Sequence, residues 1–196
     1  MLGLLISRVP WVGLRVERMD LRGILVEIHS ALRDLAIEHA LIGGLALAAH
    51  GAARATVDLD FLVEAERGND VARLLRERGY ECLHRSDYAA NYASRDPARG
   101  RVDFLFARRA HGKAMLVRAR PHPIPGSQIR VVDAADLIGL EVQASSNDAS
   151  RRRLDLADIQ RLLRSADVDL ARVREYFRLF DREKELDALL AEERER

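Results

Sequence analysis

The chain carries two acidic residues, one position apart, inside an otherwise apolar run. Asp58 and Asp60 alternate with the apolar residues of positions 57–63, as they would on a β-strand. Residues i and i+2 of a strand project to the same face, so the two carboxylates would lie side by side while their apolar neighbours point the other way. Two adjacent anions repel each other, and a divalent cation bound through oxygen ligands commonly offsets that repulsion. The pattern therefore predicts a strand with a metal-binding face.

The composition favours a folded protein without a strong overall charge. Of the 196 residues 48% are hydrophobic, enough for a core, and 32 Lys and Arg stand against 31 Asp and Glu. No global field therefore draws the chain to nucleic acid or to a membrane. Between positions 95 and 130, however, nine bases stand against two acids. This basic stretch favours a polyanionic substrate, with a solvated surface as the open alternative.

Cysteine content and hydropathy bear on the compartment. The single Cys82 excludes an intrachain disulfide and fits a reducing cytoplasm. No apolar run approaches the roughly 18 residues that a membrane span needs, so we expect a cytoplasmic protein with no membrane partner. Residues 1–18 lack a signal-peptide cleavage pattern, and a cleaner helical pattern begins at Met19. We expect an N-terminal arm over 1–18, or a true start at Met19.

Hydrophobic periodicity predicts an α+β first part and a helical last third. Helices are expected at 20–38, 45–50 and 69–78, and strands at 40–42, 57–63, 80–84, 88–93, 101–106 and 128–132. The Pro-rich stretch 121–126 is expected to lack regular structure. Asp133 and Asp136 can cap a helix over 133–145, and further helices are expected at 151–163, 170–180 and 183–192. We therefore expect a core over 19–132 and a C-terminal helical region over 133–196.

A third acidic residue, Asp103, lies in another apolar strand pattern. An isolated ionised carboxylate is tolerated poorly in a central strand unless a partner offsets its desolvation. If the two strands are neighbours, Asp58 and Asp60 could bind one or two Mg²⁺ ions. Asp103 would then accept a proton from an attacking hydroxyl or complete the metal shell. A structural ion pair of Asp103 with Arg54 or Arg101 is the open alternative.

A glycine pair precedes these acids. Gly43 and Gly44 form a turn that leads into a short helix, where free backbone N–H groups without a Cβ in the way suit phosphate oxygens. Arg54 adds a bidentate phosphate donor, and Thr56 adds a hydroxyl.

Taken together, these residues resemble a known family. Gly-Gly, thirteen intervening residues, Asp-x-Asp and a distant strand Asp resemble the nucleotidyltransferases of the DNA polymerase β superfamily. More narrowly, the chain is similar to the AbiEii-like toxins of toxin-antitoxin systems, on the residues Gly43-Gly44-Leu45-Ala46 and His50-Gly51-x-x-Arg54-x-Thr56-x-Asp58-Leu59-Asp60. The resemblance covers about 24–163.

The resemblance implies a fold, a reaction and a site. The core would be a mixed sheet flanked by helices. Asp58 and Asp60 would hold Mg²⁺ or Mn²⁺ with Asp103 as the third acid, while Gly43 and Gly44 would cradle the nucleoside triphosphate (NTP). A nucleotide would pass from NTP to an acceptor with release of pyrophosphate. In the toxin relatives the acceptor is the 3′ end of tRNA, and a cognate antitoxin would be a partner.

The helical region departs from the family at one position. In the segment 137–144 a family lysine that is thought to contact phosphate is replaced by Glu141, which reverses the local charge. The arginines at 151–153 are candidates for supplying the missing charge. Further on, Asp155-Leu156-Ala157-Asp158-Ile159 matches a family stretch, so Asp158 is carried over as an active-site residue. A salt bridge from Asp158 to an arginine is the structural alternative.

These features favour a metal-dependent nucleotidyltransferase acting on RNA. One alternative keeps the chemistry but takes a small hydroxylated acceptor such as an aminoglycoside. Another, suggested by Glu141, is a catalytically weakened protein that binds nucleotide or a partner. The sequence contains no Walker-type loop and no GxSxG motif.

Overall fold

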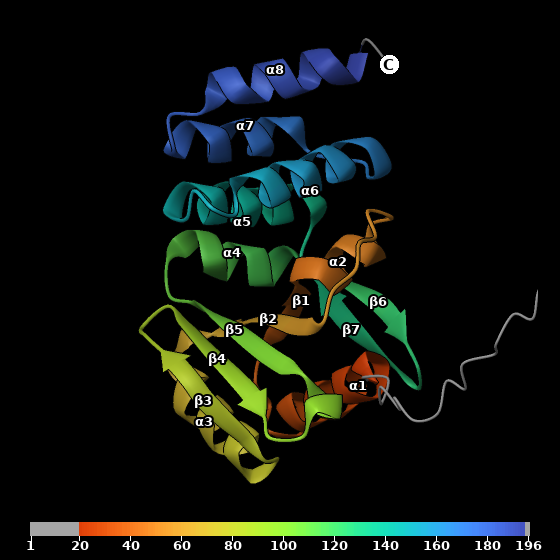
Figure 1. Ribbon diagram of the computed structural model, residues 1–196, viewed down its shortest axis with the longest axis vertical. Helices are drawn as coiled ribbons and strands as arrows, with labels where there is room; N and C mark the ends of the chain where they lie inside the picture. Colours follow the sequence, from red (N-terminus) through yellow and green to blue (C-terminus); the bar gives the residue numbers. More distant parts are fainter. Residues whose placement is uncertain (1–19, 195–196) are drawn as a thin grey trace, which may run out of the picture.

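The computed structural model describes residues 20–194 and has a seven-stranded mixed sheet at its centre (Figure 1). The strands are β1 (His39–Ile42), β2 (Asp58–Glu64), β3 (Tyr80–Arg85), β4 (Ala89–Ser94), β5 (Arg101–Ala107), β6 (Arg120–Ile124) and β7 (Ser127–Val131). Their order is β3-β4-β5-β2-β1-β7-β6. β2 runs parallel to β5, and β1 runs parallel to β7, while the other neighbours are antiparallel.

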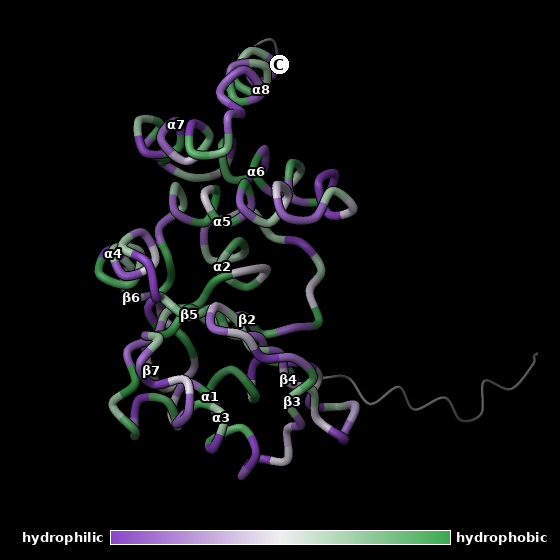
Figure 2. The backbone as a smooth tube through the Cα atoms, turned by 90° about the vertical axis from the view of Figure 1, so that its left-hand side faces the viewer, coloured by the Kyte–Doolittle hydropathy of each residue, from purple (hydrophilic) through white to green (hydrophobic). Residues whose placement is uncertain are grey.

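Helices cover both faces of the sheet. They are α1 (Leu21–Asp34), α2 (Gly43–Ala49), α3 (Gly68–Glu77), α4 (Ala110–Arg118), α5 (Ala134–Asn147), α6 (Arg152–Ser165), α7 (Leu170–Leu179) and α8 (Glu183–Arg194), with short 3₁₀ turns η1 (Ala65–Arg67) and η2 (Pro97–Arg99). Helices α1 and α3 lie on one face, and α2 and α4 lie on the other (Figures 1 and 2). Helices α5 to α8 stack beyond α2 and α4. The expected mixed sheet flanked by helices is confirmed.

The register of β2 and β5 separates an apolar face from an acidic one. Phe61 lies opposite Phe104 with the ring centroids 5.6 Å apart, on the side of the sheet where His39 packs against both Phe61 and His29 of α1. Asp60 lies opposite Asp103 and packs against Gly43 of α2, so the two carboxylates project to the other face, toward α2. The alternation of apolar and acidic residues along β2 and β5 therefore buries the apolar side chains on one face and places the acids together on the other.

Two predictions about the chain between β5 and β7 were wrong or incomplete. The Pro-rich stretch is not irregular, because Arg120–Ile124 forms β6, an edge strand paired with β7. Pro121 and Pro123 are two positions apart, so both can direct the side that lacks an N–H away from β7, which an edge strand tolerates. Helix α4 was not expected at all. The expected N-terminal arm over 1–18 lies outside the described residues, and the boundary at 132 stays a prediction.

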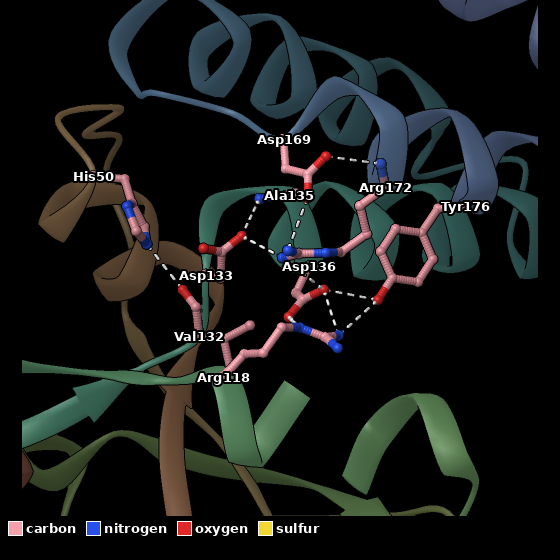
Figure 3. A network of polar contacts seen from close by, with 9 residues as sticks. All are labelled: His50, Arg118, Val132, Asp133, Ala135, Asp136, Asp169, Arg172 and Tyr176. Carbon is pink, nitrogen blue, oxygen red and sulfur yellow. Dashed lines mark hydrogen bonds and ion pairs between the residues drawn. The ribbon is translucent and has the colours of Figure 1, made fainter. Parts of the chain in front are cut away.

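A buried polar junction ties the helical region to the core (Figure 3). Asp136 of α5 is fully buried and accepts two hydrogen bonds from Arg118 of α4, both of 2.9 Å. The hydroxyl of Tyr176 on α7 donates to the same carboxylate at 2.8 Å. Nearby, Asp133 caps α5 through the N–H of Ala135 and accepts from Arg172. No helix among the described residues is long and apolar enough to span a membrane.

Beneath the sheet, His29 of α1 and His39 of β1 form a buried imidazole pair. Nδ1 of His39 lies 2.7 Å from the carbonyl oxygen of Ile37, which can only accept, so this nitrogen carries the proton. Nε2 of His39 is then the acceptor for Nδ1–H of His29 at 2.8 Å. Burial lowers the pKa of both rings, that of His29 from 6.5 to about 4. Protonating either ring would therefore place charge in an apolar site.

The imidazole pair makes stability depend on pH in a definite direction. Because the folded-state pKa lies below the unfolded value, its contribution is complete above about pH 6.5 and is lost as the pH falls toward 4. We expect the unfolding free energy to drop by about 2–3 kcal/mol over this window through the pair. Urea unfolding at pH 7 and pH 4.5 should show a smaller drop in His29→Gln than in the wild type. His84→Asn, an exposed control, should keep the full drop; equal drops in all three proteins would contradict the assignment.

Candidate functional site

The structure gathers the three acidic strand residues on one face. Asp58 and Asp60 lie on β2, and Asp103 lies at the register position opposite Asp60 on the parallel neighbour β5. Asn91 of β4 lies opposite Asp103 in turn, and its side chain bonds to that carboxylate. Arg101 lies opposite Asp58, and its guanidinium is 3.8 Å from the Asp103 carboxylate. The side-chain oxygens of Asp58, Asp60, Asp103 and Asn91 can each bind a cation, and they face one region above the sheet.

The electrostatics of this face call for positive charge. Burial and, to a smaller extent, the neighbouring Asp103 and Asp58 raise the pKa of Asp60 to about 7 against the opposing effect of Arg54 and Arg151. Burial likewise raises the pKa of Asp103, whereas Asn91 and Arg101 lower it. One oxygen of Asp103, Oδ1, is buried without a hydrogen-bond partner. A carboxylate with an unused buried lone pair beside a second one is suited to a cation or a transferable proton.

The two glycines allow these acids to contact α2. Gly43 has a φ of +62°, and a Cβ at this residue would lie 2.2 Å from Oδ2 of Asp60. A Cβ on Gly44 would lie 2.6 Å from Cβ of Thr56. Both contacts are far inside van der Waals distance, so only glycine lets the start of α2 sit against the Asp60 and Thr56 side chains. Gly-Gly and Thr-x-Asp-x-Asp are therefore two halves of one packing arrangement.

Asp158 lies at the edge of the site and holds Arg54. It is fully buried on α6, where its Oδ2 accepts from Nε of Arg54 at 2.7 Å. Its Oδ1 accepts from Arg161 at 2.6 Å. Arg54 in turn is close enough to lower the pKa of Asp60. The structure thus brings Asp158 to Arg54 rather than to the three strand acids.

Glu141 and Asp155 form a second buried acidic pair beside Asp158. Burial and the neighbouring Asp155 and Asp158 raise the pKa of Glu141 well above its usual range. This shift favours the protonated form of Glu141, which reduces the negative charge at this position. Asp155 is fully buried without a hydrogen-bond partner of good geometry, and its nearest cation is Arg151, whose Nη2 is 3.5 Å from Oδ1.

The donor set fits a divalent cation that is shared with a substrate. Within the described part of the chain, no three His, Cys, Asp or Glu side chains converge on one point as a complete metal site. Mg²⁺, however, commonly binds through one or two carboxylates, water and substrate phosphates. The unused oxygen of Asp103, the raised pKa of Asp60 and the close approach of Asp60 to Gly43 suit such an arrangement.

Ion pairs within the chain neutralise most of the basic stretch. Seven of its nine bases lie within 4 Å of a carboxylate: Arg95 with Glu81, Arg99 with Glu27, Arg101 with Asp103, Arg108 with Asp87, Lys113 with Glu66, Arg118 with Asp136 and Arg130 with Glu38. Arg109 instead stacks on the ring of Tyr88, 5.1 Å from its centroid. The excess charge in the sequence therefore does not translate into an equally strong basic surface.

Sequence reasoning did not find Asn91. The residue lies within a stretch that was expected to be a strand, but its role depends on pairing with β5 in one particular register. Alternation alone could have placed Asn91 on the polar face of β4, without identifying Asp103 as its neighbour.

Known proteins resemble this chain in sequence and in fold. A family profile described as "Uncharacterised nucleotidyltransferase" matches residues 11–191. No curated protein sequence matches significantly. Among solved structures, the antibiotic-resistance factor ANT(2″)-Ia superposes with a TM-score of 0.61 at 14% identity, covering 89% of this chain and 97% of the other. The lincosamide antibiotic adenylyltransferase LnuA gives 0.55 at 14% identity, covering 74% and 97%.

A third structure extends the likeness. It is an antigenic nucleotidyltransferase-like protein from Paracoccidioides brasiliensis, with a TM-score of 0.54 at 16% identity and coverage of 89% and 94%. At 14–16% identity these structures show a shared fold. Their substrates are not transferred to this chain on that basis. The narrower resemblance to AbiEii-like toxins stays a prediction.

Proposed function

The chain belongs to the family of uncharacterised nucleotidyltransferases, and from this premise we propose that it transfers a nucleotide from NTP to a hydroxyl acceptor. The acceptor oxygen would bond to the α-phosphorus as the bond to the bridging oxygen breaks, and pyrophosphate would leave with that electron pair. The observation that supports this reaction best is the placement of Asp58, Asp60 and Asp103 on one face beside Gly43. Positioning and charge neutralisation supply most of the catalysis in such transfers.

In this proposal the acids divide two tasks. Asp58 and Asp60, with Asp103, would hold Mg²⁺ or Mn²⁺, which when bound offsets the charge of the triphosphate and of the leaving pyrophosphate. Asp103 would also take the proton of the acceptor hydroxyl, because its Oδ1 is without a hydrogen-bond partner and its pKa is raised by burial. Asn91 would orient the Asp103 carboxylate.

The triphosphate would lie against the start of α2. Gly43 and Gly44 offer backbone N–H groups there, and Thr56 offers its hydroxyl. Arg54 would contact phosphate, while Asp158 acts as a positioning residue that fixes the Arg54 guanidinium.

Arg151 would take the place of the family lysine. It is half exposed at the start of α6, its one ion pair among residues 20–194 is with Asp155 at 3.5 Å, and its charge reaches Asp60. The raised pKa of the neighbouring Glu141 reduces the negative charge beside Arg151, so the guanidinium would remain available to a phosphate. Arg151→Ala should therefore raise the KM for NTP by about tenfold, the loss of one charge-assisted contact, with a smaller effect on kcat.

Arg152→Ala is the matched control for this prediction. It removes the same charge one position later, from a guanidinium that is bound to Glu185 of α8 at 2.6 Å. Its KM should stay within about twofold of wild type. Equal KM increases in the two variants would reduce the Arg151 effect to a general loss of charge.

We further propose an RNA acceptor, the 3′ end of tRNA, and hence a cytoplasmic toxin that a cognate antitoxin would restrain. The support is the resemblance in the segment 43–60. The ion-paired state of the basic stretch weakens the electrostatic argument for RNA, so the acceptor has to be determined directly.

The deciding experiment offers acceptors to the purified chain. It is incubated with each α-labelled NTP, with Mg²⁺ or Mn²⁺, and with total tRNA or a panel of small hydroxylated compounds including aminoglycosides. Label on tRNA from the wild type, and none from Asp58→Ala/Asp60→Ala, would support the proposal and identify the nucleotide. Label on a small compound alone would replace the RNA acceptor. No label on either, together with no effect of NTP on the melting temperature, would refute a nucleotide role.

A further inference from the structure

A groove lies on the face of the sheet that is turned away from Asp58, Asp60 and Asp103. It has a volume of about 350 Å³ and is lined by Ala72 and Arg76 of α3 and by Tyr80, Cys82, Arg85 and Tyr92 of β3 and β4. Tyr92 and Asn91 are adjacent on β4 and therefore project to opposite faces, Asn91 toward Asp103. Both views place α3, β3 and β4 at the end of the molecule opposite α8 (Figures 1 and 2). The groove is thus separate from the candidate active site.

The groove carries positive charge that the protein does not neutralise. Most described arginines form an ion pair with a carboxylate, but Arg76 makes no side-chain hydrogen bond or ion pair with another described residue. Arg85 bonds only to the neutral amide oxygen of Asn69, at 2.7 Å. The one acid that lines the groove, Glu81, is already paired with Arg95. Two guanidinium groups without a counter-charge therefore share one concave surface, which favours an anion.

A buried hydroxyl adds a third donor. Tyr92 is only 2% exposed, and its hydroxyl has no hydrogen-bond partner in the described structure. Burial raises the pKa of Tyr92, while Arg85 and Arg76 are close enough to lower it. The neutral phenol of Tyr92 lies near two guanidinium groups and can donate a hydrogen bond, but it has no acceptor in the described structure. A buried hydroxyl without a partner carries a desolvation cost.

The local backbone also sets the groove apart from ordinary sheet. The register of β3 against β4 shifts between Cys82 and His84, and Leu83 at this bulge is exposed. The Cys82 thiol donates to the carbonyl of His84 at 3.4 Å. Bulges of this kind redirect side chains next to binding sites. In this protein the bulge directly follows Cys82, which lines the groove.

We propose that this groove is a second ligand site for a small molecule with an aromatic body and an oxyanion, either phosphate or carboxylate. The rings of Tyr80 and Tyr92 and the methyl of Ala72 line it with apolar surface that suits the body. Arg76, Arg85 and the Tyr92 hydroxyl bind the oxyanion. The site is independent of the nucleotide chemistry on the other face.

Cys82 provides a built-in reporter, because it is the only cysteine of the chain and its thiol is exposed in the groove. Alkylation of the full chain by the neutral reagent N-ethylmaleimide, followed by intact mass, is measured with phenyl phosphate, benzoate or neutral benzyl alcohol as probes. We expect phenyl phosphate or benzoate, at about four times its dissociation constant, to slow alkylation about fivefold, since protection follows occupancy. Protection by one of the two anions identifies the oxyanion class.

Variants separate anion recognition from simple shielding, with each rate compared with that variant's own unliganded rate. Arg76→Gln/Arg85→Gln should bind the protecting anion at least about tenfold more weakly. Arg73→Gln, on the same helix but with its guanidinium on Asp70, should bind it normally. Tyr92→Phe should weaken binding without lowering the melting temperature, because the lost hydroxyl has no partner.

Three outcomes would overturn the proposal. They are absence of protection by both anions, equal protection by benzyl alcohol, and full protection in the double arginine variant. No nucleotide is used in any arm, so these results stand apart from the test of transferase activity.

Discussion

Replacing Asp60 by Asn is expected to abolish most nucleotidyl transfer while leaving the fold intact. Asp60 lies at the centre of the acidic face, opposite Asp103 and against Gly43, so an uncharged amide there would remove a charge that, in the proposed mechanism, holds a divalent cation. We expect a rate loss of about a thousandfold or more, equivalent to about 4 kcal/mol of transition-state stabilisation. Single-turnover transfer from labelled NTP measures it.

The same variant should not lose stability without metal. Burial and the neighbouring acids raise the pKa of Asp60 from 3.8 to about 7, so its unfavourable contribution to folding grows as the pH rises through this window and is complete above about pH 7. In EDTA at pH 8, Asp60→Asn should therefore melt at or above the wild-type temperature, and the difference should shrink at pH 5.5, where Asp60 is protonated. Asp34→Asn, an exposed substitution on α1, should change neither property. Near-normal turnover in Asp60→Asn would exclude Asp60 from the mechanism.

Replacing Asp136 by Ala is expected to have the largest effect on stability. The carboxylate is fully buried and satisfies both Arg118 and Tyr176 (Figure 3). Its removal would leave a partly buried guanidinium and a buried hydroxyl without their acceptor. Losing one partner of a buried ion pair costs about 3–5 kcal/mol, and urea unfolding at pH 7 should show a loss of this size.

Two milder variants test the cause of that loss. Asp169→Ala removes the cap of α7 and an exposed pair with Arg172, so it should cost only about 1 kcal/mol. Tyr176→Phe removes one hydrogen bond to Asp136 and should fall between the two. If Asp136→Ala cost no more than Asp169→Ala, the junction would not be a main source of stability.

The sequence predicted local structure well where periodicity and strand alternation were strong. The strands that carry Asp58, Asp60 and Asp103, and the helices after residue 133, follow from such patterns. The Asp136 junction could not be predicted, because its partners lie 18 and 40 residues away in the chain. Asp136 was interpreted as part of a helix cap, whereas only Asp133 caps α5. Local chemistry is the same for both residues, and only tertiary packing distinguishes them.

Tertiary packing also decided two other features that the sequence could not predict: the neutralisation of the basic stretch and the edge position of the Pro-rich strand β6. Nine bases in one stretch indicated a basic surface, but their partners, Glu27, Glu38 and Glu81 among them, come from other elements. Prolines at alternate positions argued against a strand, yet an edge position removes the objection for β6. In each case the missing information was which segment lies beside which.

The contacts between Arg54 and Asp158, and between Arg118 and Asp136, have a consequence for recombination between relatives. Each pair has its base in the first part of the chain and its buried acid in the last third. A chimaera that joins the first 132 residues of this chain to the helices of a relative keeps both ion pairs only where the relative has an acid at each of these two positions; elsewhere an arginine, or in the reverse exchange a buried acid, loses its partner. The helical third can therefore be exchanged without loss only between chains that have both members of each pair, or when residues 54 and 118 are exchanged with it.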